Sequence, residues 1–184
     1  MSEAEWRIRV GKPTDRDLLA SFTCADPAVG HEAEVEQFVQ TQLIDWAFAP
    51  GAAVDDPRLL LAAVTSTGEL FGVAAHERTR LLDSGGTPYN ATKIEVVAVA
   101  APWQGRRFSA GARASDVLLS AVMTDIADRV PPRDARVFAV VHGENRRSLA
   151  LLSRHGLTEE MSSPYPGYRR VVTPPATGGP RDTA

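Results

Sequence analysis

Two segments of this chain place residues that can bind anions directly after apolar, strand-like runs. In the first, the apolar run 94–100 leads into a Gln-Gly-Arg-Arg loop at 104–107, before a helical pattern begins. In the second, Asn145 begins a helical pattern after the apolar run 136–141. The first N–H groups of a helix have no partner within the helix and lie at the positive end of its dipole. Both segments are therefore candidates for binding phosphate groups.

A carboxylate that could accept a proton lies inside the first apolar run. Glu95 comes two residues before Val97, and residues two apart on a strand point to the same face, so we expect their side chains to share a face. A carboxylate surrounded by apolar residues takes up a proton more readily than one in water, which makes Glu95 a candidate general base. The alternative is a structural ion pair with Lys93, or with Arg78 or Arg80 of a neighbouring strand.

The composition is that of an ordinary globular domain. With 184 residues the chain suits one domain better than two, and 43% of its residues are hydrophobic. The formal net charge of -3 gives no general attraction to nucleic acid, so nucleic acid is not an expected partner. A single cysteine, Cys24, excludes an internal disulfide.

No pattern in the sequence indicates a membrane, a leader segment or a metal. No apolar run approaches the roughly 18 residues that a membrane-spanning helix needs, and the start of the chain does not resemble a signal peptide. We therefore expect a cytoplasmic protein without a membrane partner. The four histidines show no spacing typical of metal ligands, so no metal site is predicted. A homodimer is compatible with this composition.

Periodicity and turn residues predict alternating strands and helices around these segments. The predicted strands are 6–10, 59–64, 69–76, 94–100, 136–141 and 168–172. The predicted helices are one capped by Thr14, one over 33–48, one over 115–129 and one from Asn145 to a terminating Gly156. The segment 83–90 reads as an irregular loop, and the Pro/Gly/Thr-rich residues 173–184 as a disordered tail.

In order and spacing, the segments 93–113 and 136–157 resemble those of the GNAT superfamily of acyl-CoA-dependent N-acyltransferases. The family's phosphate-binding loop reads Gln/Arg-x-x-Gly-x-Gly/Ala. Gln104 and Gly105 match its beginning, whereas Arg107 and Ser109 stand where the family has glycine. The apolar pattern of the next helix also begins about six positions late, so we interpret 108–114 as an insertion that lengthens the loop.

The resemblance implies a single GNAT-like α/β (α+β) domain over residues 1–172. Its mixed, mostly antiparallel sheet would be flanked by helices, with the fourth and fifth strands splayed apart to admit acetyl-CoA as co-substrate. The backbone of Val97 would polarise the acetyl carbonyl, in the manner of an oxyanion hole. The residues expected to bind acetyl-CoA are Val97, Ala98, Val99, Gln104, Gly105, Arg106, Arg107, Ser109, Asn145 and Ser148.

The implied reaction is N-acetylation by direct attack of an amine-bearing acceptor on the thioester, with Glu95 as the base and the acceptor unidentified. Leu152 replaces the tyrosine that protonates the leaving thiolate in many relatives. Water, His142, or one of the tyrosines at 89, 165 and 168 remains as a source of that proton.

Two other functions remain open at this point. The altered loop and the missing tyrosine would suit a non-catalytic module that binds acyl-CoA for regulation. The Phe22-Thr23-Cys24 sequence resembles a break seen between the first two helices of toxin-type GNAT proteins that acylate aminoacyl-tRNA. The acidic residues at 32, 34 and 36 argue against an RNA-binding surface there.

Overall fold

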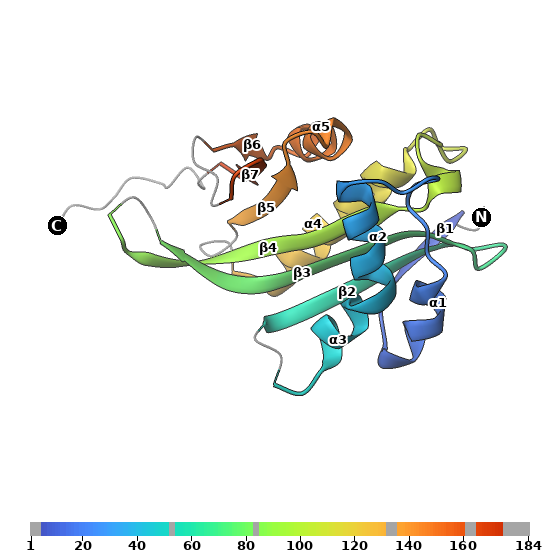
Figure 1. The fold of residues 1–184 in the computed structure, drawn as a ribbon, viewed down its shortest axis with the longest axis horizontal. Helices are drawn as coiled ribbons and strands as arrows, with labels where there is room; N and C mark the ends of the chain where they lie inside the picture. Colours follow the sequence, from blue (N-terminus) through green and yellow to red (C-terminus); the bar gives the residue numbers. More distant parts are fainter. Residues whose placement is uncertain (1–4, 52–53, 83–84, 132–135, 161–164, 175–184) are drawn as a thin grey trace.

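The computed structural model describes residues 5–51, 54–82, 85–131, 136–160 and 165–174. These residues form a seven-stranded sheet with the order β1-β2-β3-β4-β5-β7-β6 and helices on both faces (Figure 1). The strands are β1 Trp6–Val10, β2 Asp55–Val64, β3 Leu70–Leu82, β4 Pro88–Val99, β5 Val137–His142, β6 Thr158–Glu159 and β7 Tyr168–Val172. The helices are α1 Arg16–Ala20, α2 His31–Thr41, α3 Leu43–Phe48, α4 Ala114–Arg129 and α5 Arg146–Arg154.

The pairing of the strands opens a gap in the middle of the sheet. All described strand pairs are antiparallel except β4 and β5, which run parallel and pair only from Thr92–Ile94 to Val137–Ala139. Beyond these residues, β4 continues to Val99 and β5 to His142, but the two strands no longer pair with each other. The predicted fold, including the splayed fourth and fifth strands, is confirmed.

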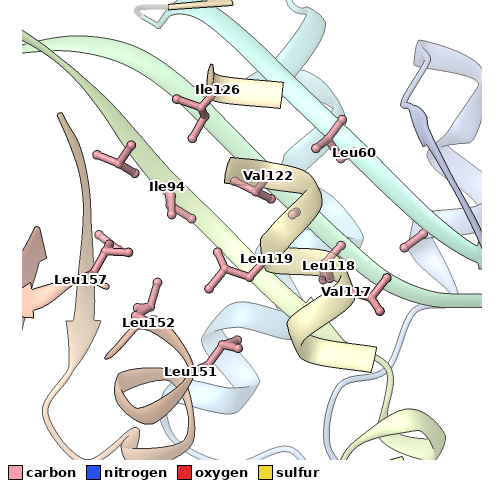
Figure 2. Close-up of a cluster of buried hydrophobic side chains, with 14 of the residues drawn as sticks. Leu60, Ile94, Val117, Leu118, Leu119, Val122, Ile126, Leu151, Leu152 and Leu157 are labelled. Atoms are coloured by element: carbon pink, nitrogen blue, oxygen red, sulfur yellow. The ribbon is translucent and has the colours of Figure 1, made fainter. Parts of the chain in front are cut away.

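Apolar side chains cover both faces of the central strands, which explains the uninterrupted apolar runs 70–75 of β3 and 96–99 of β4. On one face, Leu118, Leu119 and Val122 of α4 pack against Ile94 of β4, next to the leucines of α5 (Figure 2). On the other face, Leu19, Val39 and Leu43 of the first three helices pack against Leu59 and Val73 of β2 and β3. The sheet is therefore the middle layer between two hydrophobic cores.

Several predicted boundaries were wrong, because long-range pairing extends or bends the elements. The segment 88–90 is not irregular but opens β4, where Pro88 to Asn90 pair with Leu82 to Arg80 of a β3 longer than predicted. The single helix predicted over 33–48 is two helices that meet at Gln42. Val39 of α2 and Leu43 of α3 are both buried, on either side of this junction.

The structure also differs from the sequence analysis at a helix cap, at a short strand and at the C-terminal segment. Thr14 does not cap the first helix; instead, the carboxylate of Asp15 accepts a hydrogen bond from the Lys12 N–H at 2.7 Å. The short β6 was not predicted. Of the predicted tail, Thr173 continues the sheet by bonding to Val137, and residues 175–184 lie outside the described part of the chain.

No helix within the described ranges has the length and apolar character needed to cross a membrane.

Candidate active site

A cavity of about 710 Å³ lies beside the segment of β4 that has no β5 partner. Val97, Ala98 and Val99 form one wall. Val97 and Val99 pack toward the core under α4, whereas Ala98 packs toward the core under the first three helices. The remaining lining residues are Cys24, Glu32, Val35, Gln104, Gly105, Arg107, Arg113, Ser115, Asn145, Arg147, Ser148, Ala150, Leu151 and Arg154. The lining thus draws on elements from both faces of the sheet.

The end of β4 presents backbone polar groups to the gap. Ala100 donates its N–H to Phe71 O of β3 at 2.9 Å. Because N–H directions alternate along a strand, the N–H groups of Val99 and Val97 point away from β3, toward the side where no strand pairs. In agreement, Val99 O accepts a bond from the Gln104 side chain at 3.2 Å. The N–H of Val97 therefore faces the gap, and its role in polarising a carbonyl stays a prediction.

The loop after β4 is a small hairpin, not a smooth extension of the phosphate-binding turn. Arg107 and Arg113 form an antiparallel bridge, and Phe108 N–H bonds to Ala112 O at 2.9 Å. The Phe108 ring is buried against Phe71 and Trp103, with centroids 5.2 and 5.5 Å away. The predicted insertion at 108–114 therefore has a structural anchor of its own, which brings Arg107 and Arg113 to the cavity.

Unpaired backbone donors lie at the base of this hairpin. Gly105 has a φ of +73°, a conformation that favours glycine, and no atom lies near the position of an added Cβ. At the start of α4, Ala114 and Val117 donate to Arg106 O and Arg113 O. The N–H groups of Ser115 and Asp116 between them have no hydrogen-bond acceptor in the described part of the chain. Such donors at a helix N-terminus favour an anion.

Two predicted phosphate-binding residues lie elsewhere. The Arg106 guanidinium lies 5.5 Å from the ring centroid of Trp103, and Ser109 N–H donates to the Glu5 carboxylate at 2.8 Å. Neither residue lines the cavity. Gln104 does, but its side chain holds the site together, because it donates to Cys24 O and Val99 O and accepts from Arg147 at 3.0 Å.

The start of α5 contributes a capped and basic wall. Asn145 Oδ1 accepts a bond from Ser148 N–H at 3.1 Å, which confirms the predicted cap. Arg147, Leu151 and Arg154, at helical spacing, lie along the cavity with Ser148. The two arginines were not predicted as site residues, although this spacing was a signal that could have indicated them. Arg154 also pairs with Asp116 of α4 at 2.8 Å.

Glu95 lies on a different face from the one predicted. β3 and β4 pair Ala75 with Val96 but His76 with Ile94, so Glu95 is the extra residue of a β-bulge. The bulge turns Ile94 toward the core under α4 and Val96 toward the opposite core. Glu95 shares the side of Lys93, whose Nζ lies 2.5 Å from Glu95 Oε2, and not the face of Val97.

The ion pair of Glu95 was one of the two predicted alternatives, and it forms with Lys93. Glu95 does not line the cavity. Glu77 lies opposite Lys93 on β3, and burial, together with the charge of Glu95, raises the pKa of Glu77.

The tyrosines considered as proton donors lie outside the cavity lining. Tyr89 lies under the guanidinium of Arg136, 5.0 Å from it, and the Tyr168 hydroxyl contacts Glu34 at 3.4 Å. Leu152 is buried in the core and brings no hydroxyl. His142 stacks on His31 of α2 with ring centroids 5.1 Å apart, and its Nδ1 accepts a bond from Glu144 N–H at 3.3 Å.

Cys24 lines the cavity as a buried thiol. Burial raises the pKa of Cys24 to about 11, and the nearby carboxylates of Glu36 and Glu32 add to the effect. The thiol therefore stays protonated at neutral pH and is a poor nucleophile. In the described part of the chain, no group of three or more His, Cys, Asp or Glu residues could hold a metal ion.

Comparison with known proteins identifies the fold. No protein-family model and no curated protein sequence matches the chain. Among solved structures, a bacterial toxin gives a TM-score of 0.69 at 14% identity, with 91% of this chain and 89% of the other covered. The toxin AtaT, as a mutant bound to acetyl-CoA and to the C-terminus of the antitoxin AtaR, gives 0.59 at 13% identity, covering 92% and 94%.

Arabidopsis thaliana NAA60, in complex with a bisubstrate analogue, gives a TM-score of 0.56 at 15% identity and covers 91% of this chain and 98% of its own. GNAT acyltransferases and GNAT-type toxins share this architecture, and the fold of this chain is the GNAT fold. The family resemblance predicted from the sequence is confirmed at the level of the fold.

Proposed function

We propose that this protein is an acyl-CoA-dependent N-acyltransferase that transfers an acetyl group from acetyl-CoA to an amine. One observation carries the proposal: a single cavity joins unpaired N–H groups at the start of α4 to the free backbone edge of β4. The first can hold a pyrophosphate, and the second can hold an extended pantetheine chain. The GNAT fold supports the same reading.

In this proposal, the N–H groups of Gly105 and Ser115 bind the pyrophosphate, with Arg107 and Arg113 supplying positive charge. The Val97 N–H polarises the thioester carbonyl. The amine nitrogen attacks that carbon, the C–N bond forms and the C–S bond breaks, and the amine loses a proton to a base. The thiolate of coenzyme A leaves and takes a proton from water.

Glu95 is kept as the base in this proposal on the family resemblance; because its carboxylate lies outside the cavity lining, it would have to take the proton through water. His142, at the end of β5, is the alternative proton acceptor. The two groups have different contacts: the Glu95 carboxylate pairs with Lys93, whereas the His142 ring stacks on the His31 ring of α2.

Titration calorimetry with coenzyme A and acetyl-CoA tests the proposal directly. The double variant Arg107→Ala/Arg113→Ala should bind coenzyme A about tenfold or more weakly, because charge-assisted contacts to phosphate are lost. Arg106→Ala is the matched control, because Arg106 lies over Trp103 outside the cavity, and it should bind normally. No binding of coenzyme A to the unchanged protein at millimolar concentration would remove the acyltransferase proposal.

A second candidate function is that of a toxin whose acyl transfer arrests growth. It is favoured by the likeness to the bacterial toxin and to AtaT. Growth arrest on expression, relieved in the Arg107→Ala/Arg113→Ala variant, would support it. Binding of acetyl-CoA without transfer to any amine offered would instead favour the non-catalytic module.

A further inference from the structure

The charged residues of the cavity are divided between two sets of elements. Four arginines, Arg107, Arg113, Arg147 and Arg154, come from the loop after β4 and from α5. Among the described residues that line the cavity, Glu32 in the first turn of α2 is the one acidic residue, and it belongs to the helical layer on the opposite face of the sheet from α4 and α5. The cavity therefore has a basic end, which can bind phosphate, and an acidic side, which repels it.

The Glu32 carboxylate is free to bind a ligand. Within the described part of the chain it has no hydrogen bond or ion pair, although its neighbours on α2 do. The Glu36 carboxylate accepts the Cys24 N–H at 2.8 Å, and the Glu34 carboxylate contacts the Tyr168 hydroxyl at 3.4 Å. An unpaired carboxylate in a partly enclosed space attracts a cation more strongly than one in open water.

The first turn of α2 is held in place beside the gap. His31, the residue before Glu32, stacks on His142 of β5, and the His142 ring meets Tyr168 of β7 edge-on with centroids 5.2 Å apart. The Glu32 carbonyl also lies 3.8 Å from the Cys24 thiol. These contacts hold the backbone of Glu32 beside the cavity, from which its carboxylate can reach a bound ligand.

We propose that Glu32 determines acceptor specificity by binding a second ammonium group on the acceptor, as in an aliphatic diamine. This inference rests on the proposed N-acyltransferase function. The attacking amine must be deprotonated, and therefore neutral, when it reacts. The positive charge that Glu32 binds during the reaction must therefore be on a second amine of the acceptor. The arginines repel that group from the phosphate end, and Glu32 attracts it, so the acceptor is oriented with its reactive amine toward β4.

Two conjugates of coenzyme A test this inference without the need for turnover. In both, the sulfur carries an acetamide linker: in one it joins 1,4-diaminobutane, which ends in an ammonium, and in the other n-pentylamine, which ends in a methyl group. By calorimetry, the unchanged protein should bind the cationic conjugate about tenfold more tightly than the neutral one, as expected for one charge-assisted contact. Glu32→Gln should abolish the difference and leave the affinity for free coenzyme A unchanged.

Glu34→Gln is the matched control, because it removes the same charge from the same helix turn at a residue outside the cavity lining. It should retain the preference for the cationic conjugate. Equal affinities of the unchanged protein for the two conjugates, or the same loss in both variants, would overturn the role of Glu32. Failure to bind free coenzyme A is a separate result that would overturn the proposed function itself.

Discussion

At the scale of single residues, Glu95 has one structural role that is visible and one catalytic role that is proposed. Its carboxylate pairs with Lys93 at 2.5 Å. If Glu95 is the base, Glu95→Gln should lower turnover on an identified acceptor about 10²-fold near neutral pH, because the amide cannot accept the proton. The deficit should shrink as pH rises, because more of the acceptor amine is then already deprotonated.

Lys93→Met separates the two roles, because it breaks the same ion pair but leaves the carboxylate. We expect it to lower Tm and to keep the shape of the pH profile of kcat/KM. A Glu95→Gln protein that loses stability but keeps full activity would remove Glu95 from the mechanism and favour His142.

Cys24 allows a prediction from its pKa of about 11, which burial raises above the ordinary value. Alkylation requires the thiolate, so iodoacetamide should react slowly with the folded protein at pH 7.5 and faster as pH rises toward that value. Saturating coenzyme A should slow the reaction further if it occupies the cavity that Cys24 lines. Mass spectrometry of the labelled protein measures both effects, with unfolded protein as the fast control. Rapid labelling of the folded chain at neutral pH would contradict this account.

At the scale of elements, α5 depends on its cap for both its start and its place at the cavity. Asn145→Ala removes the acceptor of the Ser148 N–H and should lower the free energy of unfolding by about 1 kcal/mol, a typical cost of losing such a cap. Asn145→Ser can still cap the helix and should recover most of that stability. Denaturant unfolding of the three proteins measures the difference, and equal stabilities of all three would show that the cap contributes nothing.

At the scale of the whole molecule, a partly buried network of charged and polar side chains joins β2, β3 and α4. His76 of β3 contacts Asp125 of α4 at 2.9 Å, and Arg58 of β2 binds the same carboxylate at 3.1 Å. Burial lowers the pKa of His76 below its ordinary 6.5, although Asp125 opposes the shift. Burial alone would raise the pKa of Asp125, but the bonds from Arg58 and His76 outweigh it, and the pKa of Asp125 lies below its ordinary 3.8.

Both shifts predict a loss of stability in acid. Below pH 6.5 the unfolded chain binds a proton at His76 more readily than the folded one, so the free energy of unfolding should fall as pH decreases. The contribution of Asp125 is complete above pH 3.8 and is lost as pH falls through its lower folded pKa. His76→Gln keeps a donor for Asp125 but does not titrate. Its Tm should therefore vary less than that of the unchanged protein between pH 7 and 5, and parallel curves would refute the role of His76.

Much of the fold could be predicted from the sequence, because its determinants are local. Strand β1 and strand β7 have the predicted bounds, and the apolar pattern of 94–100 indicated a strand covered on both faces. Asn145 caps α5, and Gly156 ends it with a φ of +84° that glycine adopts without strain. These features depend on periodicity and on residues a few positions apart.

The candidate site was only partly predictable, because its geometry depends on segments distant in sequence. A bulge against β3 reverses the alternation of β4, so Glu95 faces Lys93 and not the side of Val97. In the loop after β4, the Phe108 ring packs on Phe71, Arg107 lines the cavity and Ser109 does not, and the sequence pattern of the loop did not indicate this division. Glu32 reaches the same cavity because the first turn of α2 lies beside β5, where His31 stacks on His142. Local patterns in the sequence therefore predicted most of the elements and their order. Strand register and the packing of loops and helices join segments distant in sequence, and these long-range contacts set which side chains meet at the site.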